Sequence, residues 1–261
     1  MPERSSYEPG TPSWVDLQTS DPAGAKQFYG ALFGWDYDDQ DAGHDAEGNA
    51  AVYSMATKHG KHVAAIAPLP MAGVPPHWNV YVTVTDVDAC AAQVPGAGGT
   101  VAMAPFDVMD VGRMALIADP TGALVCLWQP KGHIGAYLVN EPGTFAWEEV
   151  MTPDIAAATE FYAKIFGWEA SPVDMPGMQY TELKLNGRGI GGALPPPMEG
   201  VPAMWAVYFA VDDCDKAVEV AQSNGGTVIQ PPFDIPPGRM AVVADPAGAM
   251  FNVIKLAQPG E

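Results

Sequence analysis

Short stretches in which hydrophobic and polar residues alternate recur along the chain, and helical patterns separate them. "WVDLQ", from Trp14, and "NVYVTV", from Asn79, alternate as half-buried strands do. Each leads into a turn that opens on an aspartate, Asp21 or Asp86, followed by a short amphipathic helix. Aspartate suits a helix start because its side chain accepts amide hydrogens of the first turn. Two or three short strands follow, so the pattern predicts a βαβββ module.

The pattern repeats along the chain. "FYGALFGW", from Phe28, returns as "FYAKIFGW", from Phe161, at an offset of 133 residues. Later the offset becomes 127 or 126, as for Trp78 with Trp205, and "DPTGALVCLW" aligns with "DPAGAMFNVI". We interpret the repeated phrase as packing the module helix on its sheet. Gly and Trp at its end close the helix and begin the next strand.

A repeat of this length predicts two copies of one domain. The copies span residues 11–130 and 144–256, and a linker of residues 131–143 joins them. Each copy contains two similar halves, so the chain is expected to hold four βαβββ modules. The predicted fold class is α+β, with two domains in tandem.

Charge and composition narrow the set of partners. The chain has 12 basic and 31 acidic residues, a net charge of -19, which repels nucleic acid and anionic membranes. It contains no apolar run of the ~20 residues that a membrane helix requires, and "MPERSSYEPG" lacks the apolar core of a signal peptide. We therefore expect a cytoplasmic protein, with Cys90, Cys126 and Cys214 as reduced core thiols.

A strand followed by "D....A..FY..LFGW" and later by "GR.....DP.GA" resembles the vicinal oxygen chelate superfamily over nearly the whole chain. This superfamily includes glyoxalase I, bleomycin-resistance proteins and extradiol dioxygenases. The two-copy form is similar to actinobacterial members, among them glyoxalase-like proteins and antibiotic-pathway proteins labelled as hydroxylases. The resemblance implies that paired modules curl into half-open barrels, with helices outside and a cavity inside.

Alternation along each strand then assigns the side chains that face the cavities. In the first copy these are Trp14, Asp16, Gln18, Asn79, Tyr81, Thr83, Leu124, Cys126 and Trp128. In the second copy they are Trp147, Glu149, Met151, Ala206, Tyr208, Ala210, Met250, Asn252 and Ile254. Methionines are expected to add an adaptable lining or roof: Met71, Met103, Met109, Met151, Met175 and Met178.

Family members that carry out chemistry typically hold a divalent metal by His or Gln, His, and Glu on three inward strands. The resemblance places these positions at Trp14, Asn79 and Cys126 and at Trp147, Ala206 and Asn252. These side chains are poor metal ligands, so no metal and no other cofactor is expected. The alternative is a rearranged divalent metal site built from His77, Asp16 and Cys126.

The histidines have a simpler interpretation. His77 is expected to be a polar residue near the cavity mouth. The remaining histidines lie in loop-like or edge segments without ligand spacing and are expected to be solvated: His44, His59, His62 and His133.

The aromatic residues predict a flat apolar slot. Trp14 and Trp147 occupy equivalent first-strand positions, and Tyr81 and Tyr208 match on the facing strand. Such rings can stack on a planar ligand, at ~0.5–1.5 kcal/mol per pair beyond area burial. The alternative is that they simply fill the barrels.

Charged residues add two hypotheses. Asp16 and Glu149 match on the inward faces, and a buried carboxyl with a raised pKa could act as a general base. Arg113 and Arg239 are interpreted as structural, each holding a strand turn through the nearby Asp107 or Asp234. The alternative is that they hold an anionic ligand group.

Three functions remain open from the sequence. The preferred one is a metal-free protein that binds a planar aromatic or polyketide-like small molecule, as an accessory in antibiotic biosynthesis or self-resistance. The alternative is an enzyme, a glyoxalase-type lyase or isomerase or a hydroxylase or dioxygenase, with a rearranged metal or acid-base site. The third is a scaffold with filled barrels. The expected state is a monomer or a homodimer, without nucleic-acid or membrane partners.

Overall fold

The computed structural model describes residues 3–44, 50–71, 73–175 and 178–257. The first half contains β1 (Pro12–Thr19), α1 (Pro22–Phe33), β2 (Asp36–His44), β3 (Ala50–Lys58), β4 (Lys61–Pro68), β5 (His77–Thr83), α2 (Val87–Gln93), β6 (Thr100–Val108), β7 (Gly112–Ala118) and β8 (Leu124–Pro130). The second half contains β9 (Phe145–Met151), α3 (Ile155–Phe166), β10 (Glu169–Met175), β11 (Met178–Leu185), β12 (Arg188–Leu194), β13 (Met204–Ala210), α4 (Cys214–Ser223), β14 (Thr227–Ile235), β15 (Gly238–Ala244) and β16 (Met250–Leu256).

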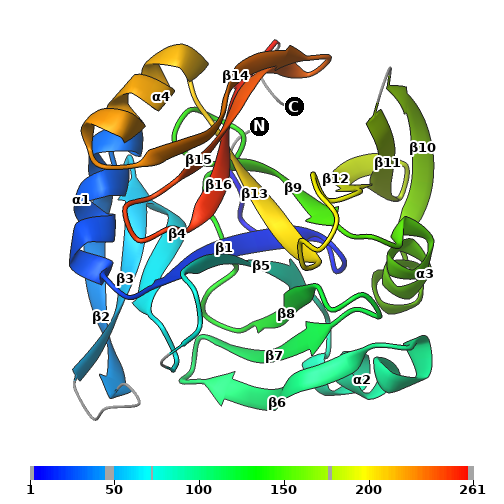
Figure 1. Ribbon diagram of the computed structural model, residues 1–261. Coiled ribbons are helices and arrows are strands. Elements are labelled where there is room, and N and C mark those ends of the chain that lie inside the picture. The colour runs from blue at the N-terminus through cyan, green and yellow to red at the C-terminus, as the bar shows by residue number, and fades with distance from the viewer. Residues whose placement is uncertain (1–2, 45–49, 72, 176–177, 258–261) are drawn as a thin grey trace.

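The strands form two eight-stranded sheets with the same topology. Their orders are β2-β3-β4-β1-β5-β8-β7-β6 and β10-β11-β12-β9-β13-β16-β15-β14. In each sheet the first strands of the two modules pair antiparallel at the centre, and the last strand of each module pairs with a first strand in parallel. The sheets curl with the helices on their outer sides (Figure 1). The predicted α+β fold of four βαβββ modules in two half-open barrels is confirmed.

Local sequence sets the limits of the helices as predicted. Asp21 accepts a hydrogen bond from the amide of the third residue beyond it, and Asp86 does the same. At the other ends of α1 and α3, Gly34 and Gly167 have φ angles of 70° and 74°, a left-handed conformation that glycine adopts without strain.

The repeated phrase also joins the two halves of the chain. The ring of Tyr29, on α1, lies 5.3 Å from that of Phe251 on β16. Its hydroxyl donates to Asp245 over 3.2 Å, and Tyr162 on α3 donates to Asp119 over 3.0 Å. The repeated phrase therefore also docks each helix onto the other half of the chain, which its interpretation from the sequence did not include. Asp119 and Asp245 belong to the "DP.G" turns, so each turn binds the helix of the other half of the chain.

The tryptophan that ends each phrase makes a reciprocal contact. Trp35 Nε1 donates to the Gly143 carbonyl and Trp168 Nε1 to the Gly10 carbonyl, both over 2.7 Å. Both glycines belong to an "EPGT" segment that precedes a first strand, and both have positive φ angles, 89° for Gly10 and 83° for Gly143. Each half of the chain thus holds, by one hydrogen bond, the segment that precedes the first strand of the other half.

The core runs continuously through both halves. The three cysteines are buried and free, which confirms their assignment as core thiols. Among the described residues, no helix is both long and apolar enough to cross a membrane.

Candidate functional site

A hydrogen-bond network surrounds Asp16 inside the first barrel. The carboxyl group is on β1 and its residue is 2% exposed. It accepts hydrogen bonds from Tyr81 Oη over 2.7 Å, Asn79 Nδ2 over 2.9 Å and Tyr53 Oη over 3.0 Å. Trp14 Nε1 donates to the Tyr53 hydroxyl over 3.0 Å. Residues from β1, β3 and β5 thus converge on one buried carboxyl group.

The second barrel repeats this arrangement with a glutamate. Glu149, on β9, is 7% exposed and accepts a hydrogen bond from the hydroxyl of Tyr208 on β13. The Tyr180 hydroxyl and the Trp147 indole are further hydrogen-bond partners of this carboxyl. Trp147 Nε1 donates to Tyr180 over 3.0 Å, as Trp14 does to Tyr53. The matched inward positions predicted from the sequence therefore meet in each barrel.

Burial changes the acid-base properties of both networks. Desolvation raises the pKa of Asp16 and of Glu149, and the tyrosine hydrogen bonds offset part of this rise. Burial also raises the pKa of Tyr81 and Tyr208 well above 10, so these hydroxyls remain hydrogen-bond donors at neutral pH. Such a site can hold a polar oxygen of a ligand or transfer a proton.

The prediction of the tyrosine partners was incomplete. Tyr53 and Tyr180, on β3 and β11, were not proposed as site residues. They match each other at an offset of 127 residues, the same offset as Trp78 and Trp205, so the repeat contained the signal.

Aromatic rings close over Trp14 in the first barrel. The His133 ring meets that of Trp14 edge-on at 4.6 Å, and Trp128 Nε1 donates to the His133 carbonyl over 2.9 Å. The expectation that His133 is solvated is wrong: burial, reinforced by His62, lowers the pKa of His133 to about 4. His62 is also partly buried, with its ring 6.1 Å from that of His133. The linker thus packs against the first barrel.

The other predicted lining residues divide into two groups. Cys126 and Asn252 are buried beside the central strands as expected, at 2% and 5% exposure, whereas Leu124 and Met250 are 44% and 41% exposed. His77 is partly exposed, and its Nδ1 lies 2.9 Å from the Pro75 carbonyl, as suits a residue at the rim.

The methionine prediction is only partly supported. Three of the proposed lining methionines, Met71, Met103 and Met109, are 60%, 44% and 67% exposed and point to solvent. Met151 is partly buried in the second barrel, and the side chain of Met178 lies outside the described residues.

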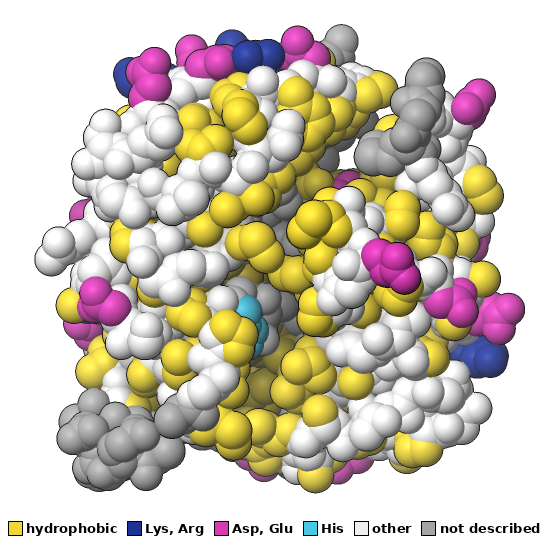
Figure 2. All heavy atoms as spheres, in the orientation of Figure 1, with side chains coloured by type: hydrophobic (Ala, Val, Ile, Leu, Met, Phe, Trp, Pro, Cys, Tyr) yellow, Lys and Arg dark blue, Asp and Glu magenta, His cyan; other side chains and the backbone are white. Residues whose placement is uncertain are grey.

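Figure 2 shows hydrophobic side chains around hollows over the concave faces of the sheets.

The donor set does not fit a metal centre of the family type. No group of three histidine, cysteine, aspartate or glutamate residues within the described ranges could hold a metal ion. The indole nitrogens of Trp14 and Trp147 are hydrogen-bond donors without a free lone pair, and both donate to tyrosines. The oxygens of Asp16 already accept three hydrogen bonds, which also argues against the rearranged site with His77 and Cys126.

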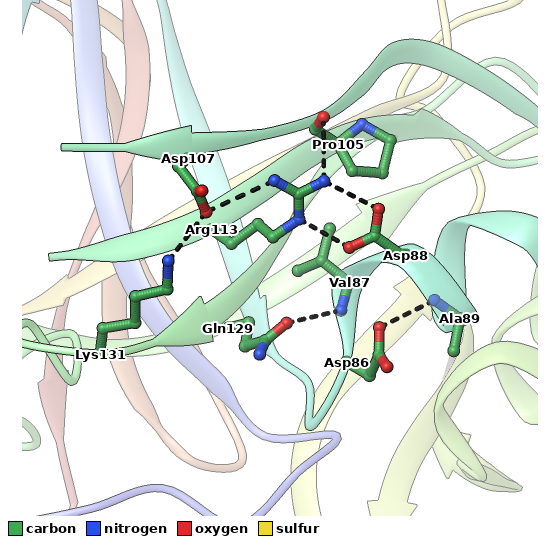
Figure 3. A network of polar contacts seen from close by, with 9 residues as sticks. All are labelled: Asp86, Val87, Asp88, Ala89, Pro105, Asp107, Arg113, Gln129 and Lys131. Atoms are coloured by element: carbon green, nitrogen blue, oxygen red, sulfur yellow. Dashed lines mark hydrogen bonds and ion pairs between the residues drawn. The ribbon is translucent and has the colours of Figure 1, made fainter. Parts of the chain in front are cut away.

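The arginines belong to surface networks away from the carboxyl sites. Arg113 binds Asp88, in the first turn of α2, over 2.6 and 2.8 Å and Asp107 over 3.4 Å (Figure 3). Arg239 repeats this with Asp215 over 2.6 Å. These contacts support the structural interpretation, although the main partner is the helix aspartate and not the neighbour on the strand.

Comparison with known proteins agrees with this architecture. Residues 11–127 and 143–253 match the family described as Glyoxalase/Bleomycin resistance protein/Dioxygenase superfamily. The chain is 52% identical to CFP32 of Mycobacterium tuberculosis, provisionally named a glyoxylase, over 98% of this chain and 99% of that protein. It is 35% identical to the anthracycline biosynthesis protein DnrV of Streptomyces peucetius, over 97% and 95%.

Solved structures share the fold at low sequence identity. The 2,3-dioxygenase LapB of Pseudomonas sp. KL28 aligns with a TM-score of 0.66 and 16% identity, over 96% of this chain and 93% of that one. A Mn(II)-bound glyoxalase of Novosphingobium aromaticivorans aligns with a TM-score of 0.64 and 16% identity, over 96% and 85%.

Proposed function

Because the chain belongs to the Glyoxalase/Bleomycin resistance protein/Dioxygenase superfamily, we propose that it binds a planar aromatic or polyketide-like small molecule without a metal. The observation that carries this proposal is the buried carboxyl–tyrosine–tryptophan network. It includes Trp14, Asn79 and Trp147, three of the strand positions at which the family resemblance places metal ligands, and it occurs in both barrels.

The network suits a ligand with an apolar face and a polar edge. An indole ring such as that of Trp147 offers a flat surface for stacking. Next to it, Glu149 and Tyr208 supply oxygen atoms that pair with hydroxyl or carbonyl groups. The strong negative charge of the chain disfavours anionic ligands at long range.

The name of one relative suggests the pathway in which such ligand binding would be used. The protein with 35% identity is named for anthracycline biosynthesis, and the two chains align over nearly their whole lengths. A role as an accessory in antibiotic biosynthesis or self-resistance is consistent with that name and with the proposed ligand class.

The second candidate is an enzyme that uses acid-base chemistry. Burial raises the pKa of Asp16 and Glu149, and a buried carboxyl group with a raised pKa can act as a general acid or base. A relative with 52% identity is named a glyoxylase, which favours lyase or isomerase chemistry, and a hydroxylase or dioxygenase is the other form of this candidate. Turnover that is lost in both Asp16→Asn and Glu149→Gln would support it.

The test is a titration of chelator-treated protein with 1,8-dihydroxyanthraquinone, a planar neutral probe, followed by tryptophan fluorescence. We expect saturable quenching that is the same before and after chelation. The double variant Trp14→Ala/Trp147→Ala should weaken binding at least tenfold, and Met109→Ala, at a residue that is 67% exposed, is the control. Unchanged affinity in the double variant would contradict the proposal. Absence of saturable binding would favour filled barrels.

A further inference from the structure

We propose that Asn186 is a site of spontaneous deamidation, and that this modification loosens the N-terminal segment, residues 3–11, from the second half of the chain. Asn186 and Gly187 form the two-residue turn between β11 and β12. In an asparagine–glycine pair the backbone nitrogen of the glycine reaches the side-chain amide with little obstruction, because glycine has no Cβ atom. The turn therefore carries the two groups that this reaction joins.

The reaction needs only water as a co-reactant. The Gly187 nitrogen attacks Cγ of Asn186, the new N–Cγ bond closes a succinimide ring, and the bond from Cγ to Nδ2 breaks. Nδ2 leaves as ammonia and carries away the proton that the Gly187 nitrogen loses. Water then opens the ring at either carbonyl, which gives aspartate or isoaspartate. Both products place a new carboxylate at the turn.

The turn leaves the attacking nitrogen accessible. Asn186 and Gly187 are exposed and have φ angles of 52° and 75°, as both central residues of a type I′ turn require. Apart from its chain neighbours, no atom lies within 4 Å of the place that a Cβ atom would occupy on Gly187. Its amide donates to no backbone carbonyl of the described residues. The tip can thus open locally without breaking a hydrogen bond of the attacking nitrogen.

A second asparagine–glycine pair, Asn224–Gly225 at the end of α4, lacks this freedom. The Gly225 amide donates to the Gln222 carbonyl over 3.1 Å. Asn224 Nδ2 donates to the Val220 carbonyl over 2.8 Å. Attack there requires both hydrogen bonds of the helix end to break, so the chain supplies its own control for the reactivity of Asn186.

Asn186 also binds the N-terminal segment. Its Nδ2 donates to Glu8 Oε1 over 2.6 Å, and Arg188 donates to Glu8 Oε2 over 3.2 Å. Two residues further on, the Gly10 amide donates to the Thr83 carbonyl over 2.8 Å. The turn between β11 and β12 therefore holds a segment that is also bound to the first half of the chain.

Deamidation reverses the contact with Glu8. The Nδ2 donor is replaced by a carboxylate oxygen, so a hydrogen bond to a charged acceptor becomes a repulsion between like charges. Isoaspartate in addition lengthens the backbone of the turn and disturbs the pairing of Leu185 with Arg188. The ion pair of Arg188 with Glu8 remains, but both side chains are exposed, and such pairs contribute little.

The modification and the contact oppose each other. While Nδ2 is bound to Glu8, the side-chain amide is held away from the rotation that the attack requires. Release of Glu8 should therefore speed the reaction, and the reaction should in turn prevent Glu8 from binding again.

Peptide mass spectrometry of the full chain, incubated at pH 8, measures the reaction. We expect Asn186 to deamidate at least fivefold faster than Asn224. Glu8→Ala should speed the reaction at Asn186 at least twofold and leave that at Asn224 unchanged. Asn186→His copies His59, which has a φ angle of 53° in the equivalent turn of the first half, and should remove the signal from this peptide. Equal rates at the two asparagines, or no acceleration in Glu8→Ala, would overturn the assignment.

Hydrogen–deuterium exchange of residues 3–11 tests the structural consequence. Asn186→Asp should speed the exchange of the Gly10 amide at least threefold at low salt, and less at high salt because salt screens the repulsion. Asn224→Asp adds the same charge at the other pair and should leave this exchange unchanged. An equal response in both variants, or none in Asn186→Asp, would contradict the release of the segment.

Discussion

Three carboxyl groups lie buried on the two central first strands, and only two of them face a barrel interior. Asp16 and Glu149 have tyrosine donors there. Glu148 lies on the opposite face of β9, is 3% exposed and takes the place of Val15 in the first half. Burial and, to a lesser degree, the neighbouring Glu149 raise the pKa of Glu148 well above its ordinary value.

Replacing Glu148 should therefore stabilise the protein in a pH-dependent way. Below the unfolded-state pKa of about 4.3 both states are protonated, and above it the folded state binds more protons, so wild-type stability falls as pH rises. Glu148→Gln should raise the free energy of unfolding at pH 8 by about 1–3 kcal/mol. The gain should shrink as the pH falls towards 4.

Urea unfolding at several pH values measures this effect. Glu219→Gln, at an exposed position of α4, controls for the general benefit of removing one negative charge from an acidic chain. Equal gains in both variants, or a gain for Glu148→Gln that does not vary with pH, would contradict the assigned burial cost.

The helices α1 and α3 dock onto the opposite half of the chain through a tyrosine and an aspartate turn. Tyr29 Oη donates to Asp245 and accepts from Trp78 Nε1, both over 3.2 Å. Tyr162 makes the equivalent contacts with Asp119 over 3.0 Å and Trp205 over 3.1 Å. Each hydroxyl thus serves two buried groups from different segments.

Tyr29→Phe should lower the free energy of unfolding by about 1–3 kcal/mol, because it leaves a buried carboxyl oxygen and an indole N–H without their partner. Tyr162→Phe should cost a similar amount. Thermal and urea unfolding of both variants, with Met109→Ala as an exposed control, test this. A loss for neither tyrosine would show that these contacts do not stabilise the docked helices.

Sequence pattern predicted the elements and the faces of the strands well, and their long-range partners less well. Alternation places Trp14 and Asp16 on one face, because period two determines which side chains share a side. It does not reveal that Tyr29 reaches the other half of the chain, since that depends on how the sheets are docked. His133 was misassigned for the same reason: its surroundings come from β1 and β8, not from its neighbours in sequence.

The whole molecule is a duplicated unit whose halves are locked by reciprocal contacts and whose barrels have diverged. The tryptophan anchors at Gly10 and Gly143 are equal in length, 2.7 Å each. The interiors, in contrast, differ where Asn79 is replaced by Ala206.

A carboxyl–tyrosine–tryptophan network includes strand positions at which the family resemblance places metal ligands, in both barrels. Elemental analysis tests the proposed metal-free binding most directly, on protein purified without chelators or metal-affinity columns and again after incubation with zinc, nickel, manganese and iron(II). We predict metal far below one equivalent per chain in every sample, because the first-strand positions carry Trp14 and Trp147. Tightly held metal near one equivalent per barrel would contradict the account and indicate a metal-dependent lyase or oxygenase.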